Sequence, residues 1–434
     1  MRCTTRTQRV LLCRVFLLGI ALVSVYLVGK SLTGIMISDC WQRTKNTFEE
    51  NGVLIPIGVE VSDTQEGKSG QPKEQLQRQR QRMEGRQSQA ERYCQHTGTK
   101  DGETDEQHSP TSCPLVSLTH PSMFCSIGKI GSTFWSRFYK VLDRNASSLL
   151  DSPFTVPVKV ADEERCQSAD NIGSLTASRR HVVKSMFVRD PFSRLFSAYV
   201  DKLLAPNPTF WTTWGIPAML LEGSLEAKDV TCGHAVTFQQ FVRLVNNRLH
   251  REDPHVISSV RMCDPCKMNY DVIGKMETFS EDLRYLTSVL NVTFDPRLSL
   301  ATESKVDAIL DSVESPFEWR EDITKCISTQ EMGRRIWRKL QIRGIIMSST
   351  VFSKAALEAA IKSTDKDQLV LQKRQAFMEA YRTLSMDDIH VFSQLFADDF
   401  EAFGYDKRPA AVFDRNLTFV DTHAFDVNTP WATS

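Results

Sequence analysis

Two neighbouring strand–turn–helix patterns constrain the fold of this chain more than any other feature. One is Met123–Leu142 and the other is Val182–Leu204. Each begins with a short apolar run, continues through a polar turn and ends in residues that are apolar at helical spacing. In open α/β sheets this order places anion-binding groups at helix N-termini. Together the two units predict a sheet that binds two phosphate-like groups.

The later unit has an arginine at the point where its strand should end. Val182–Val188 is short and rich in β-branched residues, which indicates a buried strand. The pair Asp190–Pro191 supplies a helix N-cap and a residue suited to the first helical position, so the helix should begin beside Arg189. Ser193 and Ser197 share one face of that helix. A guanidinium group and two hydroxyls can hold a phosphate, but an Arg–Asp pair that closes an ordinary turn is the competing interpretation.

The earlier unit has a lysine in its turn. The expected strand is Met123–Ile127, the turn is Gly128–Thr133 and the helix is Phe134–Leu142. Lys129 would be a compact positive charge among free backbone N–H groups, and the hydroxyl residues that end the turn would cap the helix. The order of residues is not that of a Walker A loop, in which a glycine directly precedes Lys-Ser/Thr. The turn therefore argues against a nucleoside triphosphatase.

The two segments resemble the cofactor-binding segments of the Golgi carbohydrate sulfotransferases, which modify chondroitin, dermatan, terminal N-acetylgalactosamine or glucuronic acid. In that family P-K-x-x-x-T-x-W-x-R holds the 5′-phosphosulfate of 3′-phosphoadenosine 5′-phosphosulfate (PAPS), and R-[DE]-P-F-x-R-L-x-S-A-Y holds its 3′-phosphate. The first motif is matched at Lys129, Thr133, Trp135 and Arg137, with Gly128 in place of the proline and Phe134 in place of the usual asparagine. The second motif is matched at Arg189–Phe192, Arg194–Leu195 and Ser197–Tyr199.

The resemblance implies a cofactor site built from both turns. The first turn would contribute Gly128, Lys129, Ile130, Gly131, Ser132, Thr133 and Phe134, and the second would contribute Arg189, Asp190, Pro191, Phe192, Ser193, Arg194, Leu195, Phe196 and Ser197. Lys129 would stabilise the charge that develops on the sulfuryl group and on its bridging oxygen in the transition state. Arg189 and Ser197 would grip the 3′-phosphate and so position the donor. No metal is implied, because a sulfuryl group carries less charge than a phosphoryl group.

The resemblance covers Cys113 to about Asp406. It implies a single α/β domain similar to P-loop nucleotide kinases, with a parallel sheet flanked by helices. The implied reaction is in-line transfer of the sulfuryl group of PAPS to a hydroxyl of a glycan or proteoglycan acceptor.

Two other classes of protein function stay open. A lumenal kinase would use a nucleoside triphosphate and magnesium, and a catalytically silent, membrane-anchored glycan-binding protein would fit the altered Gly128, Phe134 and Val256.

Transfer to a hydroxyl needs a base, and His255 is the main candidate. It precedes Cys263 at a place where the family has a His-Trp pair, although Val256 replaces the tryptophan here. Imidazole titrates in the useful range, so His255 can take the proton of an acceptor hydroxyl. A surface histidine or a satisfied core histidine is the competing interpretation. Glu277 and Asp190 are the alternative carboxylate bases.

The N-terminal segment predicts membrane attachment. Val10–Gly29 is about long enough to span a bilayer, and the arginines around its start place residues 1–9 in the cytosol. A cleaved signal peptide is the rival interpretation. Residues 30–112 are polar around QPKEQLQRQRQRMEGRQ and are expected to form a flexible lumenal stem, with a solvated helix as the alternative at Lys73–Arg92. The catalytic domain would then be 113–428, in a single-pass type II protein of the Golgi membrane.

The cysteines indicate an oxidising compartment. Eleven are present, and Cys3 and Cys13 lie on the cytosolic or membrane side, which leaves nine in the lumen. Most of these should form disulfides, and the odd number leaves one free or bridging to another chain. Cys263–Cys266 is also compatible with zinc binding beside His250 and His255, or with a redox pair. Its expected role is structural disulfide bonding, and the connectivity stays open.

The charge balance gives no long-range field. Lysine and arginine total 53, and aspartate and glutamate also total 53, so nothing favours nucleic acid as a partner.

Arg334–Arg343 is interpreted either as a solvated helix face or as a docking strip for an anionic glycan. Residues 205–231 and about 300–365 fit the family poorly and are expected to select the acceptor. No oligomeric state follows from the sequence.

The C-terminal segment Phe377–Tyr405 is expected to close the domain. Hydrophobic residues make up 41% of the chain, which is enough for a sizeable core. The positions of this segment expected to face the core are Tyr381, Leu384, Ile389, Phe392, Phe396, Phe400 and Phe403.

Overall fold

The computed structural model describes residues 72–97, 114–144, 147–163, 181–223, 230–348, 366–420 and 422–428. These residues all belong to one compact unit of the chain. The expected cytosolic tail, the anchor at 10–29 and the first part of the stem lie outside the described residues. Among the helices of the described segments, none combines the length and the apolar character that a membrane span requires.

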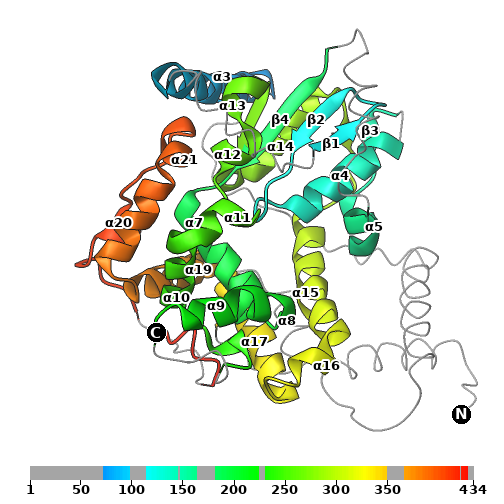
Figure 1. The fold of residues 1–434 in the computed structure, drawn as a ribbon. Helices are drawn as coiled ribbons and strands as arrows, with labels where there is room; N and C mark the ends of the chain where they lie inside the picture. The colour runs from blue at the N-terminus through cyan, green and yellow to red at the C-terminus, as the bar shows by residue number, and fades with distance from the viewer. Residues whose placement is uncertain are drawn as a thin grey trace, which may run out of the picture. The chain divides into compact units, whose positions relative to one another are not determined.

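A four-stranded sheet forms the core of the described fold (Figure 1). Its strands are β1 (Pro114–Ser117), β2 (Ser122–Cys125), β4 (Val183–Val188) and β5 (Val272–Lys275), in the order β1-β2-β4-β5. Strand β4 is parallel to both β2 and β5, whereas β1 is antiparallel to β2. A parallel sheet flanked by helices confirms the predicted α/β class, and the antiparallel edge strand lies outside that prediction. Strands β3 (Leu149–Leu150) and β6 (Thr293–Phe294) pair separately.

Helices cover the sheet and extend the domain below it (Figure 1). The helices closest to the argument are α3 (Pro72–Thr97), α4 (Ser132–Arg144), α7 (Pro191–Tyr199), α14 (Phe279–Val289), α15 (Leu300–Glu318), α17 (Thr329–Ile342) and α19 (Lys366–Arg382). The other α-helices are α5 (Val158–Glu163), α8 (Pro208–Phe210), α9 (Ile216–Leu220), α10 (Phe238–Leu244), α11 (His250–Glu252), α12 (Ser259–Cys263), α13 (Pro265–Met268), α16 (Arg320–Ile323), α20 (Met386–Leu395), α21 (Ala397–Ala402) and α22 (Ala410–Phe413). Short 3₁₀ turns are η1 (Pro153–Thr155), η4 (Gly233–Ala235) and η6 (Met276–Thr278), and π-helical turns are η2 (Val200–Leu204), η3 (Trp211–Gly215) and η5 (Val245–Leu249).

Both predicted strand–turn–helix units are present. Strand β2 leads through a turn into α4, and β4 leads through Arg189 and Asp190 into α7. The Asp190 side chain accepts a hydrogen bond from the backbone N–H of Ser193 (2.7 Å), and Pro191 opens the helix, so the predicted N-cap is confirmed. Because β2 and β4 are adjacent and parallel, both turns leave the same edge of the sheet.

Aromatic side chains fix the helices to the sheet. Trp135 of α4 is fully buried and packs between Phe124 of β2 and Phe187 of β4, with ring centroids 4.4 and 4.5 Å away. A second core cluster joins α7 to the C-terminal helices, where the ring of Phe192 meets that of Tyr381. All the core-facing positions predicted in the C-terminal segment are buried, namely Tyr381, Leu384, Ile389, Phe392, Phe396, Phe400 and Phe403.

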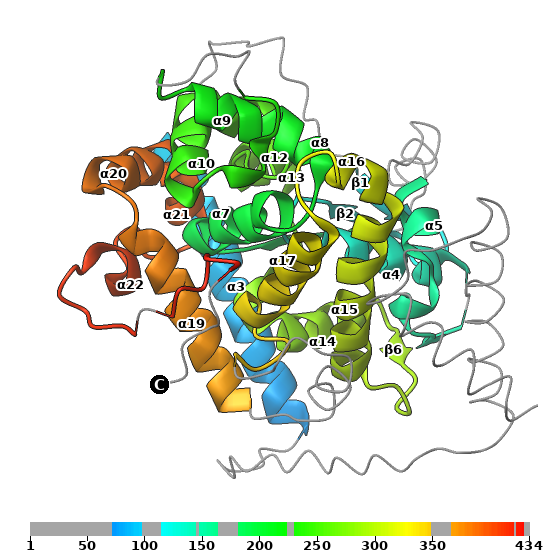
Figure 2. The same cartoon turned by 90° about the horizontal axis from the view of Figure 1, so that it is seen from below.

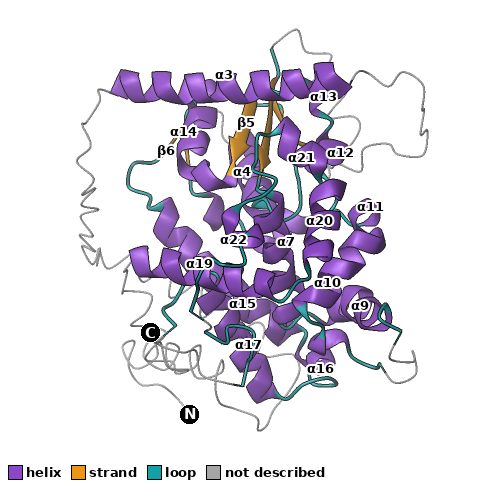
Figure 3. Ribbon diagram, turned by 90° about the vertical axis from the view of Figure 1, so that its left-hand side faces the viewer, coloured by secondary structure: helices purple, strands orange, loops and turns teal. Residues whose placement is uncertain are grey.

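Helix α3 corrects the predicted stem. The polar composition of this stretch predicts a flexible segment, with a solvated helix at Lys73–Arg92 as the alternative. Pro72–Thr97 forms a 26-residue helix, as the alternative predicts, but it packs across β5, α13 and α14 (Figure 3). Its buried apolar side chains are Met83, Ala90 and Tyr93. Few apolar contacts suffice because long polar side chains bond to the domain as well. Arg86 donates to the buried carboxylate of Asp282 (2.7 Å), and Gln87 donates to the carbonyl oxygen of Asp271 (2.9 Å).

Among the residues that the structure describes, three disulfides join distant segments of the sequence: Cys94–Cys266, Cys125–Cys263 and Cys232–Cys326. The first ties α3 to α13, and the second ties the end of β2 to the end of α12. Cys263 and Cys266 therefore have different partners. This confirms structural disulfide bonding and excludes a redox pair or a zinc site at this motif. Cys40, Cys113 and Cys166 lie outside the described residues.

Candidate functional site

The lysine-bearing turn and the arginine-bearing turn lie side by side. The Arg189 guanidinium donates from Nη1 to the carbonyl oxygen of Lys129 (3.3 Å). Arg194, one helical turn further along, donates from Nε to the carbonyl oxygen of Gly128 (3.0 Å). The segments predicted to bind opposite ends of one ligand are thus hydrogen-bonded to each other where β2 and β4 end.

The turn after β2 has an unusual backbone. Lys129 has a φ of 66° and Gly131 a φ of 71°. Left-handed backbone is rare for a residue with a Cβ, and such strain clusters at ligand-binding sites. Helix α4 begins at Ser132, and the side chains of Ser132 and Thr133 are partly exposed. Neither hydroxyl makes a hydrogen bond within the described segments, so this helix N-terminus is a suitable environment for an anion.

Three lysine side chains surround one carboxylate beside this turn. The π-helical turn η2, which directly follows α7, carries Asp201 and Lys202. Lys129 Nζ lies 2.5 Å from Asp201 Oδ2, Lys339 Nζ lies 2.9 Å from Oδ1, and Lys202 Nζ is 3.5 Å away. Burial lowers the pKa of Lys129 to about 8, although Asp201 opposes that shift. Burial raises the pKa of Asp201, but the lysine charges outweigh it and hold that pKa well below its ordinary value.

A second charged group surrounds Arg189. Glu277 accepts a hydrogen bond from the backbone N–H of Asp190 (3.0 Å) and another from the hydroxyl of Tyr405 (2.9 Å). Burial lowers the pKa of Arg189, the charge of Glu277 opposes this, and the charge of Arg343 adds to it. Because Glu277 and Asp190 both hold the arginine turn in place, neither is well suited to serve as the proton-accepting base.

Only part of the predicted arginine segment is accessible. Ser193 and Ser197 of α7 are partly exposed. The Ser193 side chain is hydrogen-bonded to the Asp190 carboxylate, and for the Ser197 hydroxyl the described residues offer no hydrogen-bond partner. The buried members of the segment are Pro191, Phe192, Arg194, Leu195 and Phe196. In the earlier turn Ile130 is also buried, and Phe134 packs against Phe154 and Phe279. These apolar side chains shape the site, whereas the serines are available to a ligand.

Arg194 organises the site from inside the protein. Its guanidinium donates to the carbonyl oxygens of Gly128 (3.0 Å), Ile257 (2.5 Å) and Pro254 (3.2 Å). The sequence predicts that this residue binds the cofactor. In the structure all three nitrogen atoms of the guanidinium instead donate hydrogen bonds to backbone carbonyl oxygens. Arg194 therefore ties the lysine turn to the loop that carries His255.

His255 lies against the lysine turn with one ring nitrogen free. Its Nδ1 is 2.8 Å from Asp253 Oδ1, and Trp214 Nε1 donates to the other oxygen of Asp253 (3.0 Å). Since an ionised carboxylate only accepts, Nδ1 carries the hydrogen and Nε2 presents a lone pair, which meets no partner among the described residues. Burial lowers the pKa of His255, Asp253 opposes this, and the charges of Lys202 and Lys129 lower it further. A neutral imidazole with a free Nε2 is the form that a general base requires.

Most of the basic stretch on α17 matches neither of its predicted roles. Arg335, Arg338 and Lys339 are buried and therefore form neither a solvated face nor an exposed docking strip, whereas Arg334 is partly exposed and Arg343 is exposed. Arg335 donates to the carbonyl oxygen of Leu204 (3.2 Å), and Lys339 contacts Asp201. Sequence reasoning missed both partners of this last pair. The available signal was the apolar spacing of the same stretch, which indicates a helix packed on the domain.

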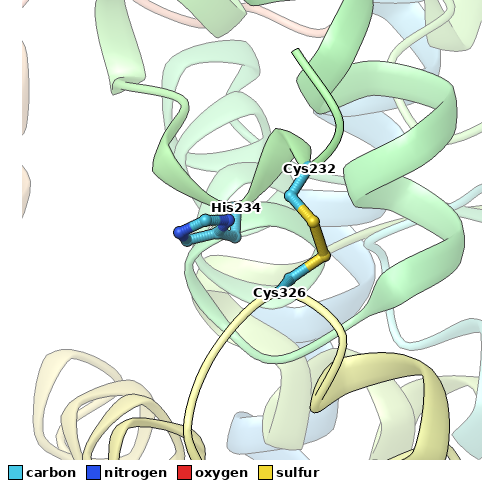
Figure 4. Close-up of side chains that lie close together, drawn as sticks. All are labelled: Cys232, His234 and Cys326. Carbon is cyan, nitrogen blue, oxygen red and sulfur yellow. A yellow bond between two sulfur atoms is a disulfide. The ribbon is translucent and has the colours of Figure 1, made fainter. Parts of the chain in front are cut away.

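Cys232, His234 and Cys326 also lie close together (Figure 4). Both sulfur atoms belong to the Cys232–Cys326 disulfide and therefore cannot act as thiolate ligands. The remaining imidazole does not make a metal centre by itself. This group is a structural link between η4 and the segment after α16.

The sheet, the two helix N-termini and the surplus of cationic side chains define an α/β protein with a site suited to an anionic ligand where its parallel strands end. The model of the sulfotransferase family matches residues 115–340, just over half of the chain. The chain therefore belongs to the sulfotransferase family.

The curated relatives that this chain matches are named carbohydrate sulfotransferases. Carbohydrate sulfotransferase 10 of Xenopus laevis is 31% identical over 216 residues, which are 44% of this chain and 59% of the relative. Carbohydrate sulfotransferase 12 of Mus musculus is 28% identical over 49% of this chain and 57% of its own length. Carbohydrate sulfotransferase 8 of Homo sapiens is 30% identical over 42% of this chain and 44% of its own length. The resemblance to carbohydrate sulfotransferases is thus confirmed, over about half the length of each relative. No solved structure gives a significant match to this chain.

Gly128 allows a close approach between the lysine turn and the His255 loop. A Cβ added at Gly128 would lie 2.7 Å from the carbonyl oxygen of Pro254 and 2.8 Å from the Cα of His255. Both neighbours are backbone, so they cannot move aside without shifting the loop. We expect Gly128→Ala to destabilise the domain by about 1–3 kcal/mol and to lower transfer activity by displacing His255. Thermal unfolding and a transfer assay measure the two effects.

Gly85 provides the matched control. It lies in α3, and a Cβ added there would meet nothing within 4 Å. Gly85→Ala should therefore leave activity unchanged and stabilise the protein by about 0.5–1 kcal/mol through helix propensity. Equal unfolding midpoints and equal activities for Gly128→Ala and the unchanged protein would show that the close approach does not exist.

Proposed function

We propose that this protein transfers the sulfuryl group of PAPS to a hydroxyl of a glycan. The observation that carries the proposal is the hydrogen bond from Arg189 to the carbonyl oxygen of Lys129, which joins two anion-binding helix N-termini into one site. Membership of the sulfotransferase family supports the reaction, and the names of the relatives support a carbohydrate acceptor.

The charges around the two turns fit an anionic donor. The cationic side chains there are Lys129, Arg189, Lys202, Lys339, Arg343 and Lys373, and the carboxylates are Asp190, Asp201 and Glu277. Arg343 and Lys373 are exposed, whereas the other four cations are at least partly buried. Buried positive charges that exceed their counter-ions are unfavourable until an anion joins them. PAPS has anionic groups at two ends and supplies the activated sulfuryl group. Ser132 and Thr133 at one helix start, and Ser193 and Ser197 at the other, are available to hydrogen-bond it.

Lys129 is the proposed electrostatic catalyst. Burial lowers its pKa to about 8, so the ammonium form still predominates at neutral pH. A fixed positive charge in a partly buried site stabilises negative charge far better than it would in water. Asp201 holds the ammonium beside the turn until the donor takes its place as the partner. Arg189 would position the 3′-phosphate, so its role is orientation rather than chemistry.

His255 is the proposed general base. Its Nε2 would accept the proton of the acceptor hydroxyl, while Asp253 would stabilise the resulting imidazolium through the Nδ1 hydrogen bond. The acceptor would approach past Phe210 of α8, whose ring is 5.2 Å from that of His255 and 4.8 Å from Lys202 Nζ. Phe210 belongs to the segment predicted to select the acceptor. A partly exposed aromatic ring there suits the apolar face of a sugar.

We also place the protein in the Golgi lumen. The three disulfides support an oxidising compartment, since such bonds are rare in the cytosol. Attachment to the membrane through residues 10–29, with the catalytic part lumenal, stays a prediction. A glycan or proteoglycan is the expected acceptor, and nucleic acid is not an expected partner.

Radiolabelled PAPS and a panel of chondroitin, dermatan and N-acetylgalactosamine-terminated acceptors test this function in the full chain. We expect label in the glycan. Lys129→Ala should reduce the rate about 10²- to 10³-fold, as for the loss of one transition-state donor. Arg189→Ala should instead raise the PAPS concentration needed for half-maximal rate about ten-fold or more, since one charge-assisted contact to the 3′-phosphate is lost.

Arg248→Ala is the control for both substitutions, because Arg248 is exposed on η5 and lies outside the two turns. It should behave like the unchanged protein. Transfer that survives both Lys129→Ala and Arg189→Ala would refute the site. Magnesium-dependent phosphate transfer from a nucleoside triphosphate would favour the kinase alternative, and acceptor binding without transfer would favour a silent glycan-binding protein.

A further inference from the structure

Helix α17 borders the site although neither motif includes it. It packs between α15 and α19 and contacts η2 (Figure 2). Lys339 of this helix is 5% exposed, and its Nζ lies 2.9 Å from Asp201 Oδ1. The other oxygen of the same carboxylate lies 2.5 Å from Lys129 Nζ. One carboxylate thus holds two ammonium groups next to each other at the lysine turn.

Arg343 follows Lys339 by one helical turn and ends the helix. Gly344, with a φ of 66°, reverses the chain directly after it. Gln372 of α19 fixes this end by donating to the carbonyl oxygen of Gln341 (2.6 Å). The Arg343 side chain is exposed and makes no ion pair or hydrogen bond with the residues that the structure describes. A free guanidinium is therefore held on a well-anchored piece of backbone.

The charge of Arg343 acts on both turns. Burial is the main cause of the lowered pKa of Lys129 and of Arg189, and the charge of Arg343 lowers each pKa further. Lys373 of α19 is affected in the same way, since burial, Arg189 and Arg343 all lower its pKa. The geometry agrees, because Arg343 lies four residues after Lys339 and so on the same face of the end of α17 as the ammonium group that contacts Asp201.

We infer that the C-terminal end of α17 is a third wall of the donor site, in which Lys339 binds the phosphosulfate end of the nucleotide and Arg343 binds its phosphates from the open side. The inference rests on the proposed function and adds two cationic residues that lie outside both motifs. The competing explanation is structural. Under it, Lys339 is present only to neutralise Asp201, and Arg343 is an ordinary surface residue.

Nucleotide binding to the full chain tests the inference. Isothermal titration with PAPS and with 3′-phosphoadenosine 5′-phosphate gives both affinities. Lys339→Met and Arg343→Met should each weaken binding about ten- to a hundred-fold, as expected for one lost contact between charged groups. Arg334→Met removes the same charge from the same helix, but Arg334 bonds to Asn428 (3.0 Å), so this control should bind like the unchanged protein.

A double variant separates ligand binding from charge neutralisation. Asp201→Asn removes the carboxylate that Lys339 would neutralise. If Lys339 contacts the nucleotide, Asp201→Asn combined with Lys339→Met should bind as weakly as Lys339→Met alone. If the double variant binds like Asp201→Asn alone, the role of Lys339 is overturned.

Two further outcomes distinguish a failure of this inference from a failure of the proposed function. Unchanged affinity in both Lys339→Met and Arg343→Met overturns the third wall while the proposed function stands. No binding of either nucleotide to the unchanged protein refutes the proposed function itself. Arg343 is exposed, so Arg343→Met still tests the third wall if Lys339→Met folds poorly.

Discussion

His255→Asn should remove most of the transfer activity and leave donor binding intact. General-base catalysis contributes about 10²- to 10⁴-fold to a rate, so kcat should fall by a factor in that range. Asparagine preserves a polar side chain of similar size but cannot take up a proton. The measurements are kcat and KM for transfer, together with the affinity for 3′-phosphoadenosine 5′-phosphate, which we expect to change little.

The pH dependence gives a second readout. The pKa of His255 is lowered from its ordinary value of 6.5, mainly by burial. The base must be neutral to accept a proton, so the rate should fall as the pH drops through a value below 6.5. The rate should also fall as the pH rises through about 8, where Lys129 loses its positive charge. Asp253 raises the pKa of His255, whereas Lys202 and Lys129 lower it. Asp253→Asn should therefore move the acid limb of the profile to lower pH.

Asp253→Asn should also reduce the maximal rate. Asp253 fixes the hydrogen on Nδ1 of His255, and an amide can instead present its own N–H to that nitrogen. The imidazole would then carry its hydrogen on Nε2, where the proton must be received. His250→Asn is the control, because His250 contacts the carbonyl oxygen of Val245 through Nδ1 (2.7 Å) and is not part of the site. Full activity in His255→Asn would show that another group takes the proton.

The sequence predicted the two strand–turn–helix units because their signals are local. Asp190 and Pro191 cap and open a helix through contacts within a few residues, and the apolar run before Arg189 indicates a strand by itself. The convergence of the turns also followed, since neighbouring parallel strands end at one edge of a sheet. The hydrogen bond between Arg189 and Lys129 agrees with that reasoning.

The same local signals could not separate ligand-binding residues from structural ones. Ser193 and Arg194 are adjacent in one motif, yet the serine side chain is partly exposed and the arginine is buried against three carbonyl oxygens. Their roles depend on the loop at Pro254–Ile257, which lies sixty or more residues away. A motif therefore locates a site, whereas the partners of each side chain depend on packing between distant segments.

The lysine pair around Asp201 and the docking of α3 were missed for the same reason. Lys339 lies far from Asp201 in the sequence, so a basic helix next to a variable region was interpreted as a surface. In α3 the apolar residues are sparse, and the helix is attached largely by polar side chains such as Arg86. Composition alone cannot show that these polar groups have partners about two hundred residues away.

Arg86→Met should destabilise the domain strongly, because Arg86 neutralises a carboxylate that has no access to solvent. Arg86 donates to Asp282 (2.7 Å), whose side chain is 0% exposed, whereas the second cation near this carboxylate, Arg82, is 3.7 Å away. Removing one partner of a buried ion pair costs about 3–5 kcal/mol, since the other charge stays buried. Arg80→Met is the matched control on the same helix. Both partners of the Arg80–Glu84 pair are exposed, so this loss should cost about 0.5 kcal/mol or less.

The effect of Arg86→Met should extend to nucleotide binding. Asp282 Oδ2 also accepts hydrogen bonds from the backbone N–H of Lys275 (2.8 Å) and the hydroxyl of Thr278 (2.6 Å), which flank Glu277. Glu277 in turn holds the arginine turn. Chemical denaturation measures the free energy of unfolding, and titration measures the affinity for 3′-phosphoadenosine 5′-phosphate. The free energy of unfolding and the nucleotide affinity should both fall in Arg86→Met, and neither should fall in Arg80→Met.

Removal of the whole helix should have a larger effect than any single substitution. A chain that begins at Cys113, the predicted start of the catalytic domain, would leave Cys266 unpaired, Asp282 without Arg86, and the surface that covers Met83 exposed to water. We expect it to aggregate or to unfold at much lower temperature, because buried apolar contacts, a disulfide and an ion pair are lost together. A chain that begins at Pro72 should keep the unfolding midpoint and the nucleotide affinity of the full protein. Equal midpoints for the two shortened chains would mean that α3 is a dispensable stem, as its composition predicts, and that the catalytic domain is complete without it.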